Sequence, residues 1–528
     1  MTMTHHRLST LLLSALLCSA RAAAQDNPPA PVPAKPLLLA QAPVGDVPPP
    51  PAGEIPPAAA QLSLEECVAR ALEKNFAVRI QTIAVSQSKN AVVIAQAVYD
   101  PIFGANWQKT VQQSPIVLFS TSSTVGGSKP TTDNQGTTLT LTQPVITGGT
   151  ITANYALTRN ASNTVQTLLN PSYNGLASIN VSQPLLQGAG VDYNRATIQI
   201  VQLGEKIANL NLKSSILTTI LNVEAAYFNL VYTRKQYVVA QDSVRLAQQL
   251  LDENIVKRDT GVLIDLDVVQ AQTGLATAKS QVIGIKQAMD NAADTLLQAL
   301  GEREFIASLG SVDFPPLTPV TPSFALSYKL ARENGPNLGV IQATIEQYKL
   351  QALKAKRSYQ PQLNAIGGAS YTSAEHSYPD ASSNVWSGSG YNWNVGLAVS
   401  IPIGLRATRA QYRQALANVQ SEQTILDQAD QALTVQVRAA VRAVESNQQG
   451  VAAATQTVIL SQKQYELQKA RFDAGVATSF LVLQAQTQLE TARLTQLQAE
   501  TNLRQALASL RFLEGTSLEV YRVNLATK

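Results

Sequence analysis

The sequence contains one segment twice. The stretch GVLIDLDVVQAQTGLATAKSQ (261–281) and the stretch GVATSFLVLQAQTQLETARLT (475–495) are identical at ten of 21 positions without a gap, and they lie 214 residues apart. Repetition over this distance indicates a duplicated unit, so the chain is expected to consist of two related halves. We place the first repeat at residues 61–315 and the second at residues 316–528.

Each half opens with a helix-forming segment that ends in the same way. The first segment begins with Ser63 followed by Glu66, the spacing of a capping box. Both segments end in Tyr-x-Pro, at Tyr99–Pro101 and Tyr359–Pro361, where proline breaks a helix. Strands are expected next, at about 101–184 in the first half and about 361–402 in the second.

The clearest strand is GYNWNVGLAVSIPIG (390–404), in which apolar residues from Tyr391 to Ile401 alternate with polar or small ones. This period of two predicts a strand with one apolar and one polar face. The longer first block also contains QPVITGGTITANYAL (143–157), which has the pattern of a hairpin. If that hairpin joins the sheet, each chain supplies six strands; alternatively, it projects from the sheet.

After each strand block the pattern becomes helical. Proline is absent from residues 185–314 and again from 403 to 528. We expect helices at about 191–300 and about 405–514, each interrupted at a glycine, Gly261 or Gly475, which suits a turn. The longer helix of each pair, of about 65 residues, is then about 100 Å long.

The first sixty residues do not resemble the rest of the chain. Residues 1–24 have the basic start, apolar middle and Ala22-x-Ala24 site of a secretory signal peptide. Leu17 before Cys18 argues against lipid attachment at that cysteine. Residues 25–60 are rich in proline and alanine and are predicted to form a disordered linker.

Composition excludes several classes of function. The net charge of +4 falls to +2 without Arg7 and Arg21, which gives no electrostatic reason to bind nucleic acid. Beyond the signal peptide the chain has one cysteine, Cys67, and one histidine, His376, too few for a His/Cys metal cluster. We see no catalytic constellation, so we expect neither an enzyme nor a cofactor. No later segment approaches 18 consecutive apolar residues, so integral contact with a membrane would need strands.

Alternating strands cross a bilayer only in a closed barrel, because open edges leave backbone groups unpaired in lipid. Four to six strands cannot close alone, so subunits must share the barrel. Long helices with small residues suit a second, helical tube. A sheet barrel continuous with a helical barrel is a conduit.

In these features the chain, from about Leu62 to Arg511, resembles the TolC-type outer membrane efflux proteins. That family carries the motif [KR]-[FY]-x-x-G, followed by a v-L-x-A-q segment, in each half. The second copy here has Arg471, Phe472 and Gly475, then Val482, Leu483 and Ala485. The first copy has Lys257, Arg258 in place of the aromatic residue, and Gly261, then Val268, Val269 and Ala271.

The resemblance implies a mostly α fold with transmembrane β-strands, in which a homotrimer forms a periplasmic α-barrel joined to an outer membrane β-barrel. That barrel would have eighteen strands if the extra hairpin crosses the membrane, and otherwise the family's usual twelve. It implies the outer membrane channel of a tripartite efflux or type I secretion system, in contact with outer membrane lipid and extending into the periplasm of a Gram-negative-type bacterium. A periplasmic adaptor and an inner membrane transporter would open it. The alternative is a periplasmic coiled-coil adaptor protein, which also has long helical hairpins.

The resemblance also suggests three groups of site residues. A pore gate at the periplasmic tip would comprise Asp265, Asp267, Leu481 and Gln484. Adaptor docking would use Lys257, Arg258, Gly261, Arg471 and Gly475. Aromatic residues at the membrane interfaces would be Trp107, Tyr155, Tyr371, Tyr391 and Trp393. Simpler roles stay open: the aspartates as solvated first-turn residues, Leu481 as packing, the basic residues as partners of helix C-termini, and the aromatics as ordinary strand residues.

Overall fold

A computed structural model describes residues 62–115, 129–163, 168–302, 312–316, 321–388, 390–401 and 403–522. These residues belong to one compact unit, Ala58–Lys528. The predicted signal peptide and linker lie outside the described residues.

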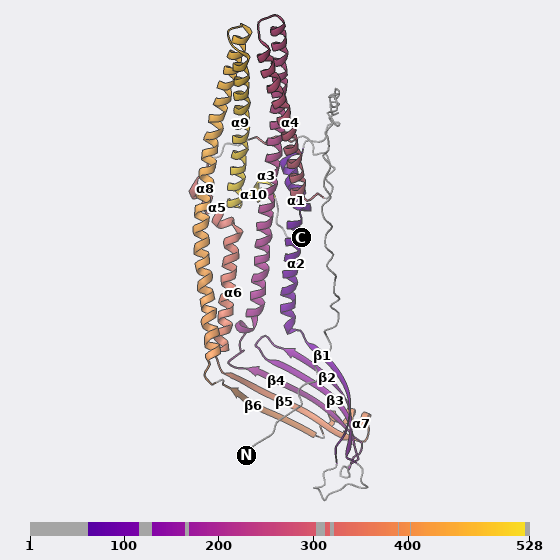
Figure 1. Cartoon of the computed structure of the whole chain (residues 1–528). Coiled ribbons are helices and arrows are strands. Elements are labelled where there is room, and N and C mark those ends of the chain that lie inside the picture. The colour runs from indigo at the N-terminus through magenta and orange to yellow at the C-terminus, as the bar shows by residue number, and fades with distance from the viewer. Residues whose placement is uncertain are drawn as a thin grey trace, which may run out of the picture. The chain divides into compact units, whose positions relative to one another are not determined.

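The two halves have the same order of elements (Figure 1). The first consists of α1 (Leu64–Lys74), α2 (Phe76–Gln96), η1 (Ala97–Tyr99), β1 (Ile102–Gln113), β2 (Thr131–Pro144), β3 (Thr150–Ser162), β4 (Ser172–Pro184), α3 (Val191–Asp259) and α4 (Asp265–Leu300). The second consists of α5 (Phe324–Asn334), α6 (Pro336–Ser358), β5 (Gln362–Glu375), α7 (Tyr378–Asn384), η3 (Val385–Ser387), β6 (Gly390–Ser400), α8 (Arg406–Asp473), α9 (Ser479–Glu514) and α10 (Ser517–Val520). Each half therefore runs helices, strands, very long helix, turn, helix.

Local chemistry explains where the opening helices begin and divide. The Ser63 side chain accepts a hydrogen bond from the backbone N–H of Glu66, which caps α1. Asn75 then separates α1 from α2 and caps α2 by accepting from the N–H of Ala77. In the second half Gly335, followed by Pro336 at the first helical position, makes the corresponding break.

The long helices α3 and α8 contain 69 and 68 residues, and α4 and α9 contain 36 each. The sequence predicted about 65 and about 35, so α3 extends for about 100 Å. Each long helix pairs with the one that follows it, and α2, α3, α6 and α8 lie side by side in that order (Figure 1). The largest apolar core, which includes Leu217, Ile220 and Leu296, lies where α1, α3, α4 and α9 meet.

The six strands form one antiparallel sheet in the order β1-β2-β3-β4-β5-β6. The pairing of β4 with β5, from Tyr173 opposite Glu375 to Pro184 opposite Asn364, joins the two halves. The predicted hairpin is β2 and β3, which lie within the sheet between β1 and β4, so it does not project. The sheet lies at the end of the helices opposite to the α3–α4 and α8–α9 turns (Figure 1).

The register gives the sheet two different faces. Strand pairing places Leu139, Tyr155, Ala177, Tyr371 and Tyr391 in one row on the apolar face. On β6 the same face exposes Trp393, Val395, Leu397 and Val399 by 62% to 81%, while Asn392, Asn394 and Ser400 belong to the other face. Within the described residues, no helix is long and apolar enough to cross a membrane.

One element departs from the expected strands. The segment between β5 and β6 forms α7 and η3, so Trp386 lies in η3 and not in a strand. Ser377 caps α7 by accepting a hydrogen bond from the N–H of Asp380, and Pro379 occupies the first turn, where its missing N–H is harmless. A helix of seven residues is too short to show a periodic pattern.

Candidate functional site

The two repeated segments form two turns of the same geometry. At the end of α3, Gly261 N–H donates to the carbonyl of Arg258 and Val262 N–H to that of Lys257; Gly475 and Val476 make the equivalent bonds after α8. This is the Schellman motif, in which the residue after the helix cap takes a left-handed conformation. Gly261 and Gly475 have φ values of 78° and 77°, which explains why both are glycine.

The aromatic residue of the second turn is part of a core between the hairpins. Phe472 is 1% exposed and packs with Leu250 of α3 and Val482 of α9. The equivalent position in the first turn is Arg258, which instead pairs with Asp259 at 2.6 Å and lies 3.8 Å from Asp265. Its hydrogen bond to Asp259 raises the pKa of Arg258. The second turn therefore buries its motif residue in apolar packing, whereas the equivalent residue of the first turn forms ion pairs.

Lys257 connects the two hairpins. Its Nζ donates a hydrogen bond of 3.0 Å to the carbonyl oxygen of Phe472 and lies 3.6 Å from the centre of the Phe472 ring. The ammonium group also lies 3.9 Å from Asp473 Oδ1. The carbonyl belongs to the last turn of α8, where the helix dipole favours a cation. Lys257 therefore interacts with the end of the neighbouring long helix as well as ending its own.

Further polar contacts join the hairpins near the turns. Ser479 Oγ donates to Asp267 Oδ1 over 3.0 Å. Lys469 of α8 forms an ion pair with Glu253 of α3 and another with Asp473 at 3.0 Å. Burial alone would lower the pKa of Lys469, but the hydrogen bonds to both carboxylates outweigh burial and raise it. We refer to the contacts of Lys257, Lys469 and Asp267 across the hairpins as the cross-hairpin contacts.

The predicted gate residues do not form one cluster within a single chain. Asp267 takes part in the cross-hairpin contacts, whereas Asp265, Leu481 and Gln484 are exposed. Asp265 and Asp267 occupy the first turn of α4, where the helix dipole favours carboxylates. The gate therefore stays a prediction, which depends on what neighbouring copies place opposite these residues.

Of the predicted docking residues, Gly261, Gly475 and Arg471 are exposed at the turns, while Lys257 and Arg258 are half-buried. Sequence reasoning missed Glu253, Lys469 and Ser479. Glu253 and Lys469 lie eight residues before Gly261 and six before Gly475. Opposite charges at nearby positions of the two repeats were the available signal for an ion pair between them.

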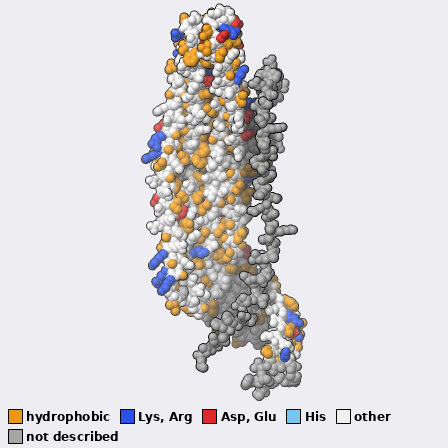
Figure 2. Space-filling model, viewed as in Figure 1, with side chains coloured by type: hydrophobic (Ala, Val, Ile, Leu, Met, Phe, Trp, Pro, Cys, Tyr) orange, Lys and Arg blue, Asp and Glu red, His pale blue; other side chains and the backbone are white. Residues whose placement is uncertain are grey.

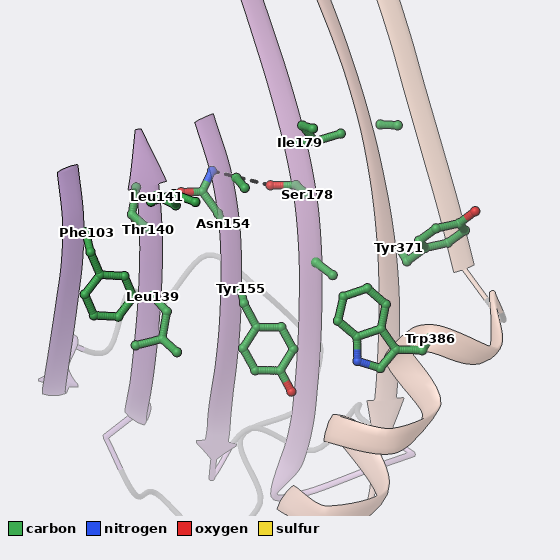
Figure 3. Close-up of a pocket in the computed structure, with 13 residues that line it drawn as sticks. Phe103, Leu139, Thr140, Leu141, Asn154, Tyr155, Ser178, Ile179, Tyr371 and Trp386 are labelled. Carbon is green, nitrogen blue, oxygen red and sulfur yellow. Dashed lines mark hydrogen bonds between the residues drawn. The ribbon is translucent and has the colours of Figure 1, made fainter. Parts of the chain in front are cut away.

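The predicted interface aromatics lie on the apolar face of the sheet, and Trp107, Tyr371, Tyr391 and Trp393 are exposed there. Tyr155 differs, because its ring stacks on Trp386 at 6.1 Å and its hydroxyl is 2.9 Å from Ser382 Oγ. Tyr155, Tyr371 and Trp386 line an apolar cavity of about 410 Å³ on this face (Figure 3). Their place at a membrane boundary stays a prediction.

This fold, with a two-faced sheet at one end of two very long helical hairpins, is the one expected above for a channel that joins a strand barrel to a helical tube. The family model described as "Outer membrane efflux protein" matches residues 150–302 and 327–516. The chain therefore belongs to the outer membrane efflux protein family.

Relatives and solved structures agree with this assignment. Outer membrane protein TolC of Salmonella enteritidis is 26% identical over 307 residues, which cover 56% of this chain and 61% of that protein, less than two thirds of its length. TolC of Escherichia coli strain K12 is 25% identical over 359 residues, or 64% of this chain and 71% of that protein. The outer membrane channel OprN shares the fold with a TM-score of 0.65 at 15% identity, covering 86% of this chain and 89% of that one. VceC of Vibrio cholerae shares the fold with a TM-score of 0.62 at 14% identity, covering 86% of this chain and 96% of that one.

Family membership confirms the expected fold class and location and the expectation that the protein is not an enzyme. The fold is mostly α with a β-sheet of the outer membrane channel type, and the protein is located in the outer membrane and extends into the periplasm. The family comprises channel proteins and not enzymes. The alternative of a periplasmic adaptor finds no support in these matches.

Proposed function

We propose that three copies of the chain form a passive conduit for efflux or secretion from the periplasm to the exterior. The observation that most supports this proposal is the two-faced sheet at one end of the long helices, with paired glycine turns at the other. The apolar face would meet lipid and the polar face would line water, as in other membrane barrels. Residues 1–24 would be removed on export, and the halves at 61–315 and 316–528 would be the duplicated unit.

The edges of the sheet support a shared barrel. β1 and β6 each pair on one side only among the described strands. Unpaired strand edges are not tolerated in hydrocarbon, so β6 of one copy would pair with β1 of the next. Three copies of a six-stranded sheet would give eighteen strands.

At the other end, six glycine turns would surround the mouth of the helical tube. In the closed state the cross-hairpin contacts would hold α8 against α3 and α9 against α4. Opening would separate the hairpins there, while Asp265, Asp267, Leu481 and Gln484 would line the constriction. An adaptor would dock at Gly261 and Gly475 and at the basic residues Lys257, Arg258 and Arg471.

A passive conduit needs no cofactor and supplies no energy. The energy for export would therefore come from an inner membrane transporter bound through the adaptor. Purified protein in planar bilayers is expected to form long-lived pores of low conductance in the closed state. A strain from which the gene has been deleted is expected to regain export when the gene is supplied on a plasmid. Recovery as a water-soluble monomer without detergent would contradict the proposal.

A further inference from the structure

Basic side chains gather where α6 and α8 meet the sheet. Lys356 and Arg357 lie in the last turn of α6, and Arg406, Arg409 and Arg413 lie in the first turns of α8. We call these five residues the basic collar. Figure 2 shows Lys and Arg side chains at this end of the helical part. A surface cavity of about 470 Å³ here is lined by Lys356, Tyr359, Arg409, Tyr412 and Arg413.

The positive charge of the collar is not neutralised within the described part of the chain. All five collar side chains are exposed, and none forms an ion pair with a described carboxylate. Arg409 Nε donates to the hydroxyl of Tyr359 over 3.1 Å and its guanidinium lies 5.7 Å from that ring. Tyr359 orients Arg409 without cancelling its charge.

The helix dipole favours Lys356 and Arg357 at the carboxyl end of α6, but it does not account for the arginines of α8. Arg406, Arg409 and Arg413 follow the amino end of α8, whose first turn contains no acidic residue. The helix dipole makes cations unfavourable at that end. An anion outside the chain would offset this cost.

The collar borders the apolar face of the sheet. The exposed apolar side chain of Val399 on β6 is followed by those of Ile401 and Ile403 beyond the strand. Ile403 is fully exposed, and Arg406 comes three residues after it. β5 begins at Gln362, three residues after Tyr359. This inference rests on the proposed conduit: with the apolar face of the sheet against lipid, the collar lies where the hydrocarbon ends on the periplasmic side. Tyrosine and basic residues favour this level of a membrane.

We propose that the basic collar binds the headgroups of anionic phospholipids in the periplasmic leaflet of the outer membrane. A phosphate in the cavity would meet Lys356 on one side and Arg409 and Arg413 on the other, in charge-assisted hydrogen bonds. Clusters of four or more basic residues beside a membrane-embedded segment attract anionic lipid in this way. This site is separate from the conduit and its tip.

The duplication restricts the site to one half of the chain. Relative to the Tyr-x-Pro motif, the positions of Lys356 and Arg357 are occupied in the first half by Gln96 and Ala97. The site therefore occurs once per chain, beside β5 and β6.

The test measures which lipids remain bound to the full-length protein. Wild type and variants are reconstituted in vesicles of phosphatidylethanolamine with phosphatidylglycerol as the minor component, extracted, and their bound lipids are quantified by mass spectrometry. The collar variant is Lys356→Gln/Arg409→Gln/Arg413→Gln. The control is Lys279→Gln/Lys286→Gln/Lys463→Gln, which removes the same charge from exposed positions on α4 and α8 outside the collar.

We expect the ratio of bound phosphatidylglycerol to phosphatidylethanolamine to fall at least about fivefold in the collar variant, the effect of one basic residue near an anionic surface, and to stay unchanged in the control. Equal ratios in the two variants would overturn the proposal. So would loss of the trimer with an unchanged lipid ratio, which would make the collar a contact between subunits.

A measurement on the wild type covers the case in which the collar variant does not fold. Raising NaCl from about 0.05 M to about 0.5 M shortens the screening length, so retained phosphatidylglycerol should decline while phosphatidylethanolamine does not. Retention that is independent of salt would contradict the proposal. Pore conductance, recorded in parallel, separates loss of lipid binding from loss of the conduit.

Discussion

Ser479 donates a hydrogen bond of 3.0 Å to Asp267 and so joins the first turn of α9 to the first turn of α4. These residues are not equivalent in the duplication: Ser479 lies four residues after its glycine and Asp267 lies six after its own. The position equivalent to Asp267 is Leu481, which cannot accept a hydrogen bond. Four and six residues after the glycine, the first half has Asp265 and Asp267 and the second has Ser479 and Leu481, so neither half alone carries both partners of this contact.

Removing this contact should favour the open tip. Ser479 is 2% exposed, and a buried hydrogen bond to a charged group contributes about 1.5–3 kcal/mol. We expect Asp267→Ala and Ser479→Ala each to raise conductance in planar bilayers, and the double variant to add little to either. The control Asp290→Ala changes an exposed acid of α4. Fully additive single effects would show that the two residues act independently.

Lys257 and Arg471 occupy the same motif position, yet they should behave differently. Lys257→Met removes a hydrogen bond and a cation–π contact with Phe472, so conductance without adaptor should increase. Arg471 is exposed, so Arg471→Gln should leave conductance unchanged and weaken capture of the adaptor by the purified channel. If Lys257→Met affected only adaptor capture, Lys257 would be a docking residue alone.

The turn glycines should tolerate alanine better than two other glycines with the same conformation. A Cβ at Gly261 or Gly475 would meet no atom within 4 Å, so the cost is that of left-handed backbone, about 1–2 kcal/mol. At Gly301 the added atom would lie 2.8 Å from the carbonyl oxygen of Lys74, and at Gly515 2.9 Å from Asn334. Thermal unfolding should rank Gly301→Ala and Gly515→Ala as the more destabilising pair. The reverse order would show that the tip turns rely on space and not on conformation.

The sequence predicted more of the fold than of the site, for a physical reason. Helices and strands follow from local periods, so the lengths of α3 and α8 and the faces of β6 could be read from the chain. The bond between Ser479 and Asp267 joins residues 212 apart and depends on how two hairpins pack. The spacing of apolar residues along the chain does not indicate which distant side chain will be the partner. The opposed charges of Glu253 and Lys469 were visible, but their contact was not.

A buried carboxyl group should make stability depend on pH. Glu224 is 1% exposed; its Oε1 accepts a 2.6 Å hydrogen bond from Tyr521 and lies 4.0 Å from Arg511. Burial raises the pKa of Glu224, against the smaller opposing effects of Tyr521 and Arg511. The native state therefore holds this proton more tightly than the unfolded state. The stability it contributes is complete below the unfolded pKa and is lost as pH rises through the folded pKa.

Glu224→Gln should remove this dependence while keeping an acceptor for Tyr521. The melting temperature of the variant minus that of wild type should be larger at pH 8 than at pH 5, as followed by circular dichroism in detergent. The control Glu445→Gln changes an exposed carboxyl group of α8. A shift that is the same at both values of pH would assign the effect to packing.

A lysine on the apolar face of β6 should reduce insertion into the outer membrane, whereas a lysine on the polar face should not. Val395 is 81% exposed on the apolar face, and its neighbour Asn394 belongs to the polar face. A lysine facing lipid near the bilayer midplane costs about 2–4 kcal/mol, whereas a lysine facing a water-filled lumen costs little. Val395→Lys should therefore reduce the protein recovered in the outer membrane fraction several-fold, and Asn394→Lys should not. Because both variants add the same charge to adjacent residues, equal recovery of the two would place the apolar face away from lipid and contradict the barrel.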